Sequence, residues 1–312
     1  QEISLFAMDT YMTLAAYGDS ADEALTAASR EINRLEATLS RTIDTSDVSR
    51  LNAGEAVVVQ PETRALLERA LTLSDETGGT FDMTVAPLVA LWGITSDAPR
   101  VPSQEEIDAL LPLVGGEHVH MDDAVTLDAG CAVDLGGIAK GYASQQVADI
   151  LRAHGVTSAV VSLGGNVYVC GSKPDGTPWN VGIQDPAGSG YAAMVSLTDR
   201  FAVTSGGYQR YFEAEDGTVY RHILDPRTGC PADSDLLSVT IISDDGTAAD
   251  AYSTALYVMG EQEAVSFWRT HGGFELILIT ADGRLLYTPG LSDAITKPED
   301  CAYDFQLLTA QP

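Results

Sequence analysis

Apolar residues recur at helical spacing in the first part of the chain. In residues 20–39, a serine and a glutamate at capping-box spacing precede apolar positions that step by three and four residues, which predicts an amphipathic helix. Further helices are predicted to begin at Pro61, with a stop at the glycine pair 78–79, and at Ser103. The polar residues 40–54 between the first two helices predict a loop.

After residue 157 the pattern changes to short runs of apolar, β-branched residues. These runs predict strands at residues 157–163, 192–198, 236–243 and 274–280. Residues 3–17 also alternate and predict one strand near the start of the chain. Two helices interrupt the later strands, at residues 248–259, ended by Gly260, and at 261–271. Helices early and antiparallel strands late favour an α+β fold over alternating βαβ units.

The charge balance of the chain limits the ligands it can bind. Its 312 residues include 17 basic and 45 acidic residues, a formal net charge of −28. Such a surface repels nucleic acid and anionic lipid. A ligand that carries phosphate would therefore need a local positive charge or a metal ion. No run of about 18 apolar residues occurs, so the sequence predicts no membrane-spanning helix.

The four cysteines are Cys131, Cys170, Cys230 and Cys301. None of them is in Cys-x-x-Cys spacing, which argues against a structural zinc site. They lie in apolar or loop surroundings, so free thiols are favoured over the two disulfides that four cysteines would allow.

A glycine-rich stretch between a short strand and a helix indicates phosphate binding. The stretch Asp134 to Tyr142 follows the strand-like residues 124–127 and a turn, and it opens a helical pattern that Gly155 ends. Glycines let a ligand approach the backbone, and free N–H groups at a helix start attract anions. Lys140 adds a positive charge in the first turn. The structural alternative is a tight turn with a surface lysine.

Three other segments permit either a ligand contact or a purely structural role. Asp82 follows a helix-stopping glycine pair, where a carboxylate can face a ligand or cap a turn. The glycine pair 164–165 follows a buried strand and permits either close approach of a ligand or a hairpin turn. His222 lies close to Asp225 near a strand end, where it can accept a proton from a hydroxyl nucleophile or act as a structural donor.

Asp250 and Thr254 are four residues apart on a predicted helix and so share one face. A carboxylate and a hydroxyl in this arrangement offer hard oxygen ligands suited to Mg²⁺. The alternative is an acidic residue favoured by the helix dipole and an unrelated threonine. On a helix face, the Asp250 carboxylate is expected to be dispensable for packing.

Six segments, in this order along the chain, resemble the FAD:protein FMN transferase family, also called the ApbE family. They are TFDMTVAPLVALWG, DLGGIAKGYA, SLGGN, TSGGYQRYF, HILDPRTG and ADAYSTALYVMG, and the resemblance runs from about Phe6 to Gly260. It implies an ApbE-type, T-fold-like α+β fold with mixed and antiparallel sheets, packed helices and two interlocked subdomains, forming a single domain over residues 1–312. It also implies an Mg²⁺-dependent enzyme that cleaves FAD, attaches FMN through a phosphoester to a Ser or Thr of an acceptor flavoprotein, and releases AMP.

The resemblance also implies roles for individual residues. The metal ligands would be the main-chain carbonyl of Gly137 and the side chains of Asp250 and Thr254. The catalytic groups would be His222 as the base and Lys140 beside the phosphates. Apart from the resemblance, Asp225 is the next candidate base because it lies close to His222 in the sequence. The residues expected to contact FAD are Met8, Thr10, Thr42, Thr80, Phe81, Asp82, Asp134, Lys140, Gly165, Ser205, His222 and Ile223.

The chain departs from the family pattern at two positions on the FAD-holding side. Asp9 stands where the family commonly has the glycine of Met-Gly-Thr, and Thr42 stands where some members place a stacking tyrosine. Both changes are expected to affect FAD affinity more than chemistry.

Two alternatives to the transferase remain open from the sequence. Water could replace the acceptor hydroxyl, which would make the protein an Mg²⁺-dependent FAD pyrophosphatase that yields FMN and AMP. A non-enzymatic flavin-binding protein would need neither the base nor the metal ligands. The chain begins at Gln1 rather than at a methionine, and the family it resembles is largely exported. We therefore expect an extracytoplasmic, membrane-anchored lipoprotein, tethered through a removed N-terminal lipid anchor.

Overall fold

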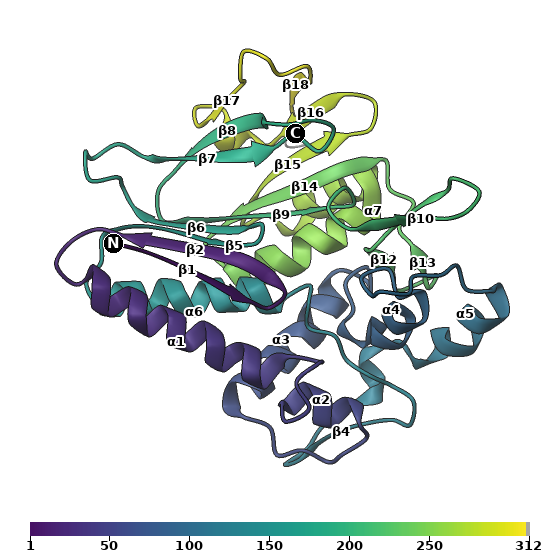
Figure 1. Ribbon diagram of the computed structural model, residues 1–312. Coiled ribbons are helices and arrows are strands. Elements are labelled where there is room, and N and C mark those ends of the chain that lie inside the picture. The colour runs from purple at the N-terminus through teal and green to yellow at the C-terminus, as the bar shows by residue number, and fades with distance from the viewer. Residues whose placement is uncertain (310–312) are drawn as a thin grey trace. The chain divides into compact units, whose positions relative to one another are not determined.

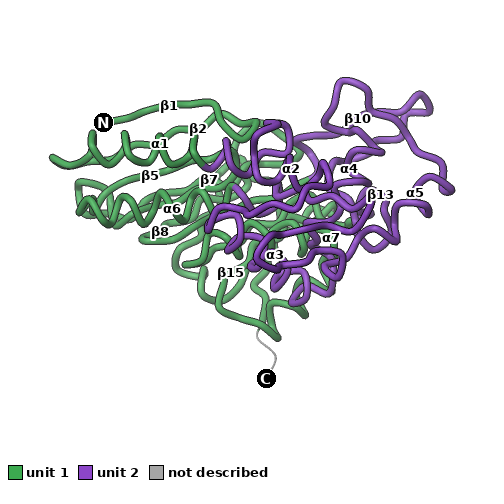
Figure 2. Tube along the Cα trace, turned by 90° about the horizontal axis from the view of Figure 1, so that it is seen from below, with its two compact units in different colours: residues 1–34, 140–206, 234–312 green, residues 35–139, 207–233 purple. Residues whose placement is uncertain are grey.

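The computed structural model describes residues 1–309 and divides the chain into two compact units. Unit 1 contains residues 1–34, 140–206 and 234 onward, and unit 2 contains residues 35–139 and 207–233 (Figure 2). Each unit is therefore assembled from stretches that are far apart in the sequence. The expectation of a single domain over residues 1–312 stays a prediction.

Unit 1 is built on one large, mostly antiparallel sheet. Within the described residues, nine strands pair in the order β1-β2-β5-β6-β9-β14-β15-β16-β18, and only the last pair is parallel. Their bounds are β1 (Glu2–Ala7), β2 (Thr10–Ala16), β5 (Ser158–Leu163), β6 (Asn166–Gly171), β9 (Arg200–Gly206), β14 (Leu236–Ser243), β15 (Glu275–Thr280), β16 (Arg284–Tyr287) and β18 (Asp304–Leu307). A smaller sheet has the order β17-β8-β7, with β7 (Trp179–Gln184), β8 (Tyr191–Leu197) and β17 (Ile295–Thr296).

Helices cover one face of the large sheet and the small sheet covers the other (Figure 1). The helices are α1 (Ala21–Leu39), α6 (Ala139–Ala153) and α7 (Gly246–His271). A short 3-10 turn, η4 (Pro289–Leu291), instead places Leu291 in the core cluster with β7 and β8. Alternate residues along a strand point to opposite faces. Val169 and Ala202 accordingly join the core cluster with β7 and β8, whereas their neighbours Tyr168 and Phe201 face the helices.

The break predicted at Gly260 is present within α7. Gly260 has φ 75° and ψ 178°, which lies outside the helical region, and the helix resumes directly after it. The Asp235 carboxylate accepts a hydrogen bond from the backbone N–H of Glu261 at 2.9 Å and so caps the second half. The helices predicted on either side of Gly260 are confirmed.

The strand predicted over residues 3–17 is in fact a hairpin of β1 and β2. Ala7 pairs with Thr10, which leaves Met8 and Asp9 as a two-residue turn with φ values of 49° and 57°. A turn of this kind needs positive φ at both central residues, and glycine or asparagine normally provides it. The prediction missed the turn because neither residue here is glycine or asparagine.

Asp9→Gly is expected to stabilise the protein, because Asp9 is exposed and holds a left-handed backbone conformation that disfavours a side chain. Removing that strain should raise the free energy of unfolding by about 0.5–1 kcal/mol. Urea unfolding of the variant beside the wild type measures the change. Asp9→Ala keeps the Cβ and is the control; equal stability of the Gly and Ala variants would contradict the strain argument.

Unit 2 is mainly helical, with short hairpins. Its helices are α2 (Asp47–Asn52), α3 (Pro61–Glu76), α4 (Ala86–Trp92) and α5 (Gln104–Leu110), with 3-10 turns η1 (Met83–Val85), η2 (Leu111–Leu113) and η3 (Gly116–His118). Its strands are β3 (Val119–Met121), β4 (Val125–Leu127), β10 (Tyr211–Glu213), β11 (Val219–Arg221), β12 (Leu224–Asp225) and β13 (Cys230–Pro231). The capping box predicted at Ser103 is present, whereas α2 lies in residues predicted to be a loop.

One apolar cluster joins the two sequence segments of unit 2. Leu88, Trp92 and Ile107 pack with Leu224 from the second segment. The indole N–H of Trp92 donates to the Gly229 carbonyl at 2.8 Å, which fixes the turn after β12. The position of the 222–229 segment within unit 2 is therefore set by α4 and α5. All four cysteines are free thiols, as the sequence favoured.

Two histidines of unit 2 converge on one carboxylate. His118 Nδ1 lies 3.0 Å from Asp128, His120 Nε2 lies 2.7 Å from it, and the second ring nitrogen of His118 lies 3.0 Å from the Pro112 carbonyl. Both partners of His118 can only accept, so the protonated ring satisfies both. The bond with Asp128 raises the pKa of His118 above its ordinary 6.5, and the bonds from His120 and His118 hold the pKa of Asp128 below its ordinary 3.8.

The stability of the protein is therefore expected to fall as the pH rises from 5.5 to 8.5. The protonated His118 ring contributes fully to the free energy of unfolding below its ordinary pKa of 6.5, and this contribution is lost as the pH rises through its raised pKa. The ionised Asp128 contributes fully above its ordinary pKa of 3.8, so its contribution is lost only in stronger acid. Urea unfolding at the two pH values should show a smaller fall for His118→Gln. His154→Gln in unit 1 is the control, and an unchanged fall in His118→Gln would contradict the assignment.

Candidate active site

Asp250 lies in the second turn of α7, and its carboxylate is buried within unit 1. The residue is only 3% exposed. One carboxylate oxygen accepts a hydrogen bond from the backbone N–H of Gly141 at 2.8 Å, and the other accepts one from Asn166 Nδ2 at 3.2 Å. These bonds join α7 to α6 and β6. They overturn the expectation that the carboxylate is dispensable for packing, because its loss would leave two buried donors unpaired.

The start of α6 packs tightly against the start of α7. A Cβ built on Gly141 would overlap the Gly246 carbonyl oxygen and the Asp250 side chain, so only glycine fits there. This close approach brings the Gly141 N–H within reach of the carboxylate. Lys140 precedes it as the second residue of α6.

Three hydroxyl groups lie together at β9 and the same part of α7. Ser205 Oγ is 2.7 Å from Ser253 Oγ and 3.3 Å from Thr254 Oγ1, and Ser253 Oγ donates to the Asp250 carbonyl at 2.8 Å. The predicted residues Ser205, Asp250 and Thr254 are therefore brought together within unit 1. Ser253 joins them although the sequence prediction did not include it.

The oxygen atoms of this group fit a small, hard cation such as Mg²⁺. In the described part of the chain, no three His, Cys, Asp or Glu side chains lie close enough to hold a metal ion together. The predicted ligand set is of a different kind, with one carboxylate from Asp250, one hydroxyl from Thr254 and one main-chain carbonyl from Gly137. The first two lie in unit 1 and Gly137 lies in unit 2.

The glycine-rich turn before α6 is held by its own aspartate. Asp134 accepts from the backbone N–H of Gly136 at 2.8 Å and pairs with Arg41 Nε at 3.1 Å. Its own N–H donates to the Met83 carbonyl at 2.7 Å. The Asp134 charge is thus balanced by Arg41, and the Gly136, Ile138 and Ala139 N–H groups are bonded within the turn itself. The phosphate contact of this turn stays a prediction.

The imidazole of His222 is oriented by a backbone carbonyl. Nδ1 lies 3.1 Å from the Arg210 carbonyl oxygen, and the backbone N–H of His222 donates to the same atom at 3.1 Å. Since a carbonyl only accepts, Nδ1 carries the hydrogen, and Nε2 is the proton acceptor of the neutral ring. This is the tautomer that a general base needs.

Asp225 stabilises the turn that follows His222. Its carboxylate accepts from the backbone N–H of Arg227 at 2.9 Å and pairs with the guanidinium of the same residue at 2.9 Å. Its carbonyl accepts from the Gly229 N–H at 2.9 Å. Because the Asp225 carboxylate is already occupied by Arg227, the geometry favours His222 over Asp225 as the base.

The Thr80–Asp82 segment forms a buried cap in unit 2. The Asp82 carboxylate accepts from the N–H and hydroxyl of Thr84, at 2.7 and 2.5 Å, and from Ser74 Oγ at 3.0 Å. Thr80 donates to the Thr77 carbonyl, and Phe81 is 4% exposed. The capping role that the sequence allowed is present, and the contact of these residues with FAD stays a prediction.

The remaining predicted residues lie at turns. A Cβ built on Gly164, the residue before Gly165, would overlap the Thr10 side chain. The β5–β6 turn therefore packs against the start of β2, directly after the Met8-Asp9 turn of the β1–β2 hairpin. Within unit 2, Thr42 is exposed and its hydroxyl lies 3.0 Å from Ser40 Oγ, whereas Ile223 is buried. The structure therefore places Met8, Thr10, Lys140, Gly165, Ser205, Asp250 and Thr254 in unit 1, and Thr42, Thr80, Phe81, Asp82, Asp134, Gly137, His222, Ile223 and Asp225 in unit 2.

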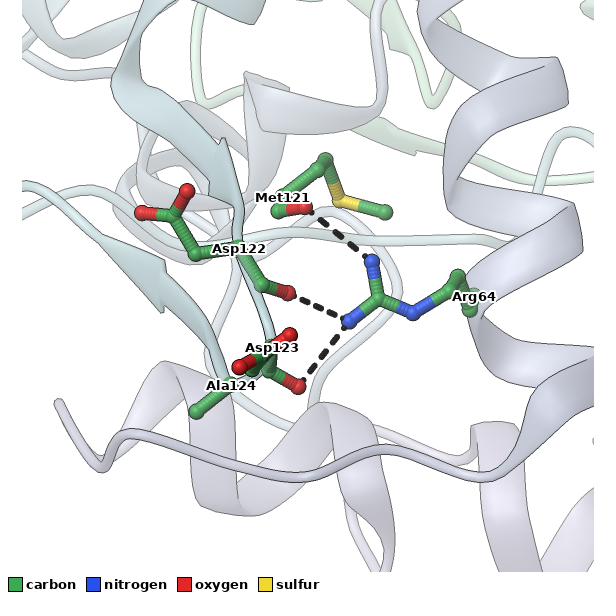
Figure 3. A pocket seen from close by; sticks show the side chains of 5 residues that line it. All are labelled: Arg64, Met121, Asp122, Asp123 and Ala124. Carbon is green, nitrogen blue, oxygen red and sulfur yellow. Dashed lines mark hydrogen bonds between the residues drawn. The ribbon is translucent and has the colours of Figure 1, made fainter.

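Unit 2 also has a surface pocket of about 660 Å³, which is lined by Arg64 and by residues 121–124. Arg64 reaches from α3 and donates to the main-chain carbonyls of Met121, Asp122 and Asp123, at 3.1, 2.6 and 3.1 Å (Figure 3). The guanidinium thereby holds the turn between β3 and β4. It has a structural role, and none of the predicted site residues lines this pocket.

Comparison with known proteins identifies the family. The sequence pattern of the ApbE family matches residues 8–278. The chain belongs to the ApbE family. A Treponema pallidum protein named FAD:protein FMN transferase is 37% identical over 286 residues, which cover 85% of this chain and 79% of the relative. An Escherichia coli K12 protein of the same name is 33% identical over 251 residues, 76% of this chain and 71% of the relative.

Solved ApbE structures share the fold. The Thermotoga maritima ApbE protein superposes with a TM-score of 0.83 at 35% identity, over 96% of this chain and 97% of that chain. The apo form of the Pseudomonas stutzeri flavinyl transferase ApbE gives a TM-score of 0.81 at 31% identity, over 96% and 94% of the two chains. The ApbE resemblance and the α+β fold predicted from the sequence are confirmed.

Two residues that hold the Asp250 carboxylate were missed by the sequence prediction. Gly141 and Asn166 both lie inside recognised ApbE segments, but they are 109 and 84 residues away from Asp250. The signal that could have found them is the glycine in Lys140-Gly141 and the amide directly after the Gly164-Gly165 pair. Spacing alone does not show that both lie against the same carboxylate.

Proposed function

We propose that this chain is an FAD:protein FMN transferase that uses Mg²⁺. The observation that carries the proposal is the buried Asp250 carboxylate, which is held by neutral donors beside the Ser205 and Thr254 hydroxyls in an ApbE fold. Curated relatives named FAD:protein FMN transferase support the activity. A protein with a net charge of −28 needs a cation to bind a pyrophosphate.

Asp250 and Thr254, with the carbonyl of Gly137, would hold the metal ion. Bound there, Mg²⁺ would supply positive charge against the pyrophosphate oxygens. Lys140 and the N–H groups at the start of α6 would add to the same field.

His222 would take the proton of the acceptor hydroxyl at Nε2, because the bond to the Arg210 carbonyl places the ring hydrogen on Nδ1. The hydroxyl oxygen of the acceptor Ser or Thr then forms a bond to the FMN-side phosphorus. The bond from that phosphorus to the AMP-side oxygen breaks, and AMP leaves. The FMN moiety remains on the acceptor through a phosphoester.

The test is incubation of the purified protein with FAD and Mg²⁺, with and without an acceptor flavoprotein. A transferase adds FMN covalently to the acceptor, which mass spectrometry detects, and AMP appears in equal amount. Free FMN and AMP without any acceptor mass gain would instead identify an FAD pyrophosphatase. FAD binding without cleavage would identify a flavin-binding protein.

We further propose that the protein acts outside the cytoplasm and is tethered to a membrane by an N-terminal lipid. In the described residues, none of the helices has both the length and the apolar character needed to cross a bilayer. The coding sequence upstream of Gln1 tests this, because a start codon immediately before it, with no hydrophobic leader, would contradict the tether.

A further inference from the structure

Asn166 begins β6, directly after the Gly164-Gly165 turn, and its side chain is buried. The residue is 2% exposed, and Nδ2 lies 3.2 Å from a carboxylate oxygen of Asp250. An ionised carboxylate can only accept hydrogen bonds, so the NH₂ group of Asn166 must face it. The orientation of the amide is therefore dictated by Asp250.

In this orientation the carbonyl oxygen of the same amide, Oδ1, is buried and makes no hydrogen bond within residues 1–309. Leaving a buried carbonyl unpaired costs free energy, and such groups in a native protein call for an explanation. The bond to Asp250 provides one, because turning the amide to satisfy Oδ1 would release the carboxylate.

The second oxygen of Asp250 is fixed in the same way by the Gly141 N–H at 2.8 Å. Two donors from two different elements therefore clamp a carboxylate that belongs to a third. Each carboxylate oxygen has two acceptor positions, so the clamp leaves one on each oxygen for another ligand.

The chemistry of this clamp differs from that of the aspartates that pair with arginine. Asp134, Asp225 and Asp282 pair with the guanidinium groups of Arg41, Arg227 and Arg284. A guanidinium cancels the negative charge of its partner. The two N–H donors to Asp250 are neutral, so they orient the carboxylate and leave its charge available to a cation.

We propose that Asn166 is a positioning residue of the metal site: it fixes the Asp250 carboxylate so that its remaining acceptor positions face a divalent cation. The inference rests on the proposed function, since that function supplies the cation. Hydrogen-bond partners of metal ligands typically change metal affinity by about 10–100-fold when they are replaced. Asn166 acts through Asp250 and needs no contact with FAD.

Titration with Mg²⁺ alone tests the clamp in the purified protein, with the melting temperature as the readout. Asn166→Leu keeps a similar volume and removes the donor. The apparent Kd for Mg²⁺ is expected to rise about 10–100-fold in this variant. A folded variant that binds Mg²⁺ as tightly as the wild type would overturn the proposal, as would a wild-type protein whose melting temperature does not respond to Mg²⁺.

Asn166→Asp keeps the inference testable should the leucine variant fail to fold. A second carboxylate beside Asp250 repels it when no cation is bound, so the variant should melt lower than the wild type without Mg²⁺. Mg²⁺ should then raise its melting temperature by more than it raises that of the wild type. The matched control is Asn180→Asp on β7, an exposed site where the same charge is added and a wild-type response is expected. Equal Mg²⁺ responses of the two Asp variants would overturn the proposal.

Different measurements would disprove the role of Asn166 and the proposed function. If the wild type does not transfer FMN to an acceptor, the transferase is wrong, and the Mg²⁺ titration still reports on Asn166. If transfer occurs and the Kd for Mg²⁺ is the same in Asn166→Leu, the clamp is wrong and the transferase stands. At saturating Mg²⁺ the transfer rate of Asn166→Leu should recover toward that of the wild type, which a general loss of structure would not allow.

Discussion

Asp250→Asn is expected to lower FMN transfer by about 10³-fold or to background, because it removes the one negative charge of the proposed metal site. Its fold should persist. The side-chain carbonyl of the introduced asparagine can still accept from the Gly141 N–H, and its NH₂ group can donate to Asn166 once that amide turns round. Turning would also give a partner to the Asn166 Oδ1 atom that has none now. The melting temperature of the variant should therefore stay near that of the wild type.

Asp250→Ala should lose both activity and stability. It leaves the Gly141 N–H and the Asn166 NH₂ group without an acceptor in a buried place, and each unpaired group costs about 1–3 kcal/mol. Transfer assays and thermal unfolding of the two variants together separate the charge from the hydrogen bonds. Undiminished Mg²⁺-dependent transfer in Asp250→Asn would remove Asp250 from the metal site.

His222→Ala is expected to lower the transfer rate by about 10²–10⁴-fold, the usual effect of losing a general base. FAD should still bind, because the proposal assigns the pyrophosphate to the metal ion, Lys140 and backbone N–H groups. Only the neutral imidazole accepts a proton, so the wild-type rate should fall toward acidic pH, and this acid limb should disappear in the variant.

The matched control for the base is His222→Asn. Its side-chain NH₂ group can reproduce the Nδ1 hydrogen bond to the Arg210 carbonyl without offering a base. Rate and FAD affinity should be measured side by side for both variants. If affinity collapses while turnover stays near that of the wild type, His222 is a binding residue. Asp225, although its carboxylate is paired with Arg227, is then the next candidate base.

Elements with strong local signals could be predicted from the sequence. The helix that begins at Pro61, the capping box at Ser103 and the break at Gly260 all depend on residues that restrict or release the backbone locally. The hairpin at Met8-Asp9 was missed because these residues hold positive φ without the glycine that usually marks it. Helix α2 was missed because a helix of 6 residues depends on burial, here of Val48 and Leu51, more than on propensity.

The site residues likewise fall into two groups: those that local sequence motifs point to, and those that depend on how distant segments pack. Motif order led to the choice of Asp250, Thr254 and His222, which all lie within the residues 8–278 that match the ApbE family, and their roles stay predictions. The donors that orient these groups could not be predicted. The Gly141 N–H and the Arg210 carbonyl act through the main chain, and a main-chain contact depends on how segments far apart in the sequence pack together.

The non-helical backbone at Gly260 interrupts α7 between two helical halves. The helical residues of a continuous helix unfold cooperatively because successive hydrogen bonds link them. Unfolding that starts at His271 is therefore expected to stop at the non-helical Gly260. The half that precedes it carries Asp250, Ser253 and Thr254, and the last two lie beside Ser205 of β9. Opening of the later half thus need not expose the amide hydrogens of the earlier half to exchange with solvent. The part of the helix that carries the proposed metal ligands is in this way insulated from motion at its own far end.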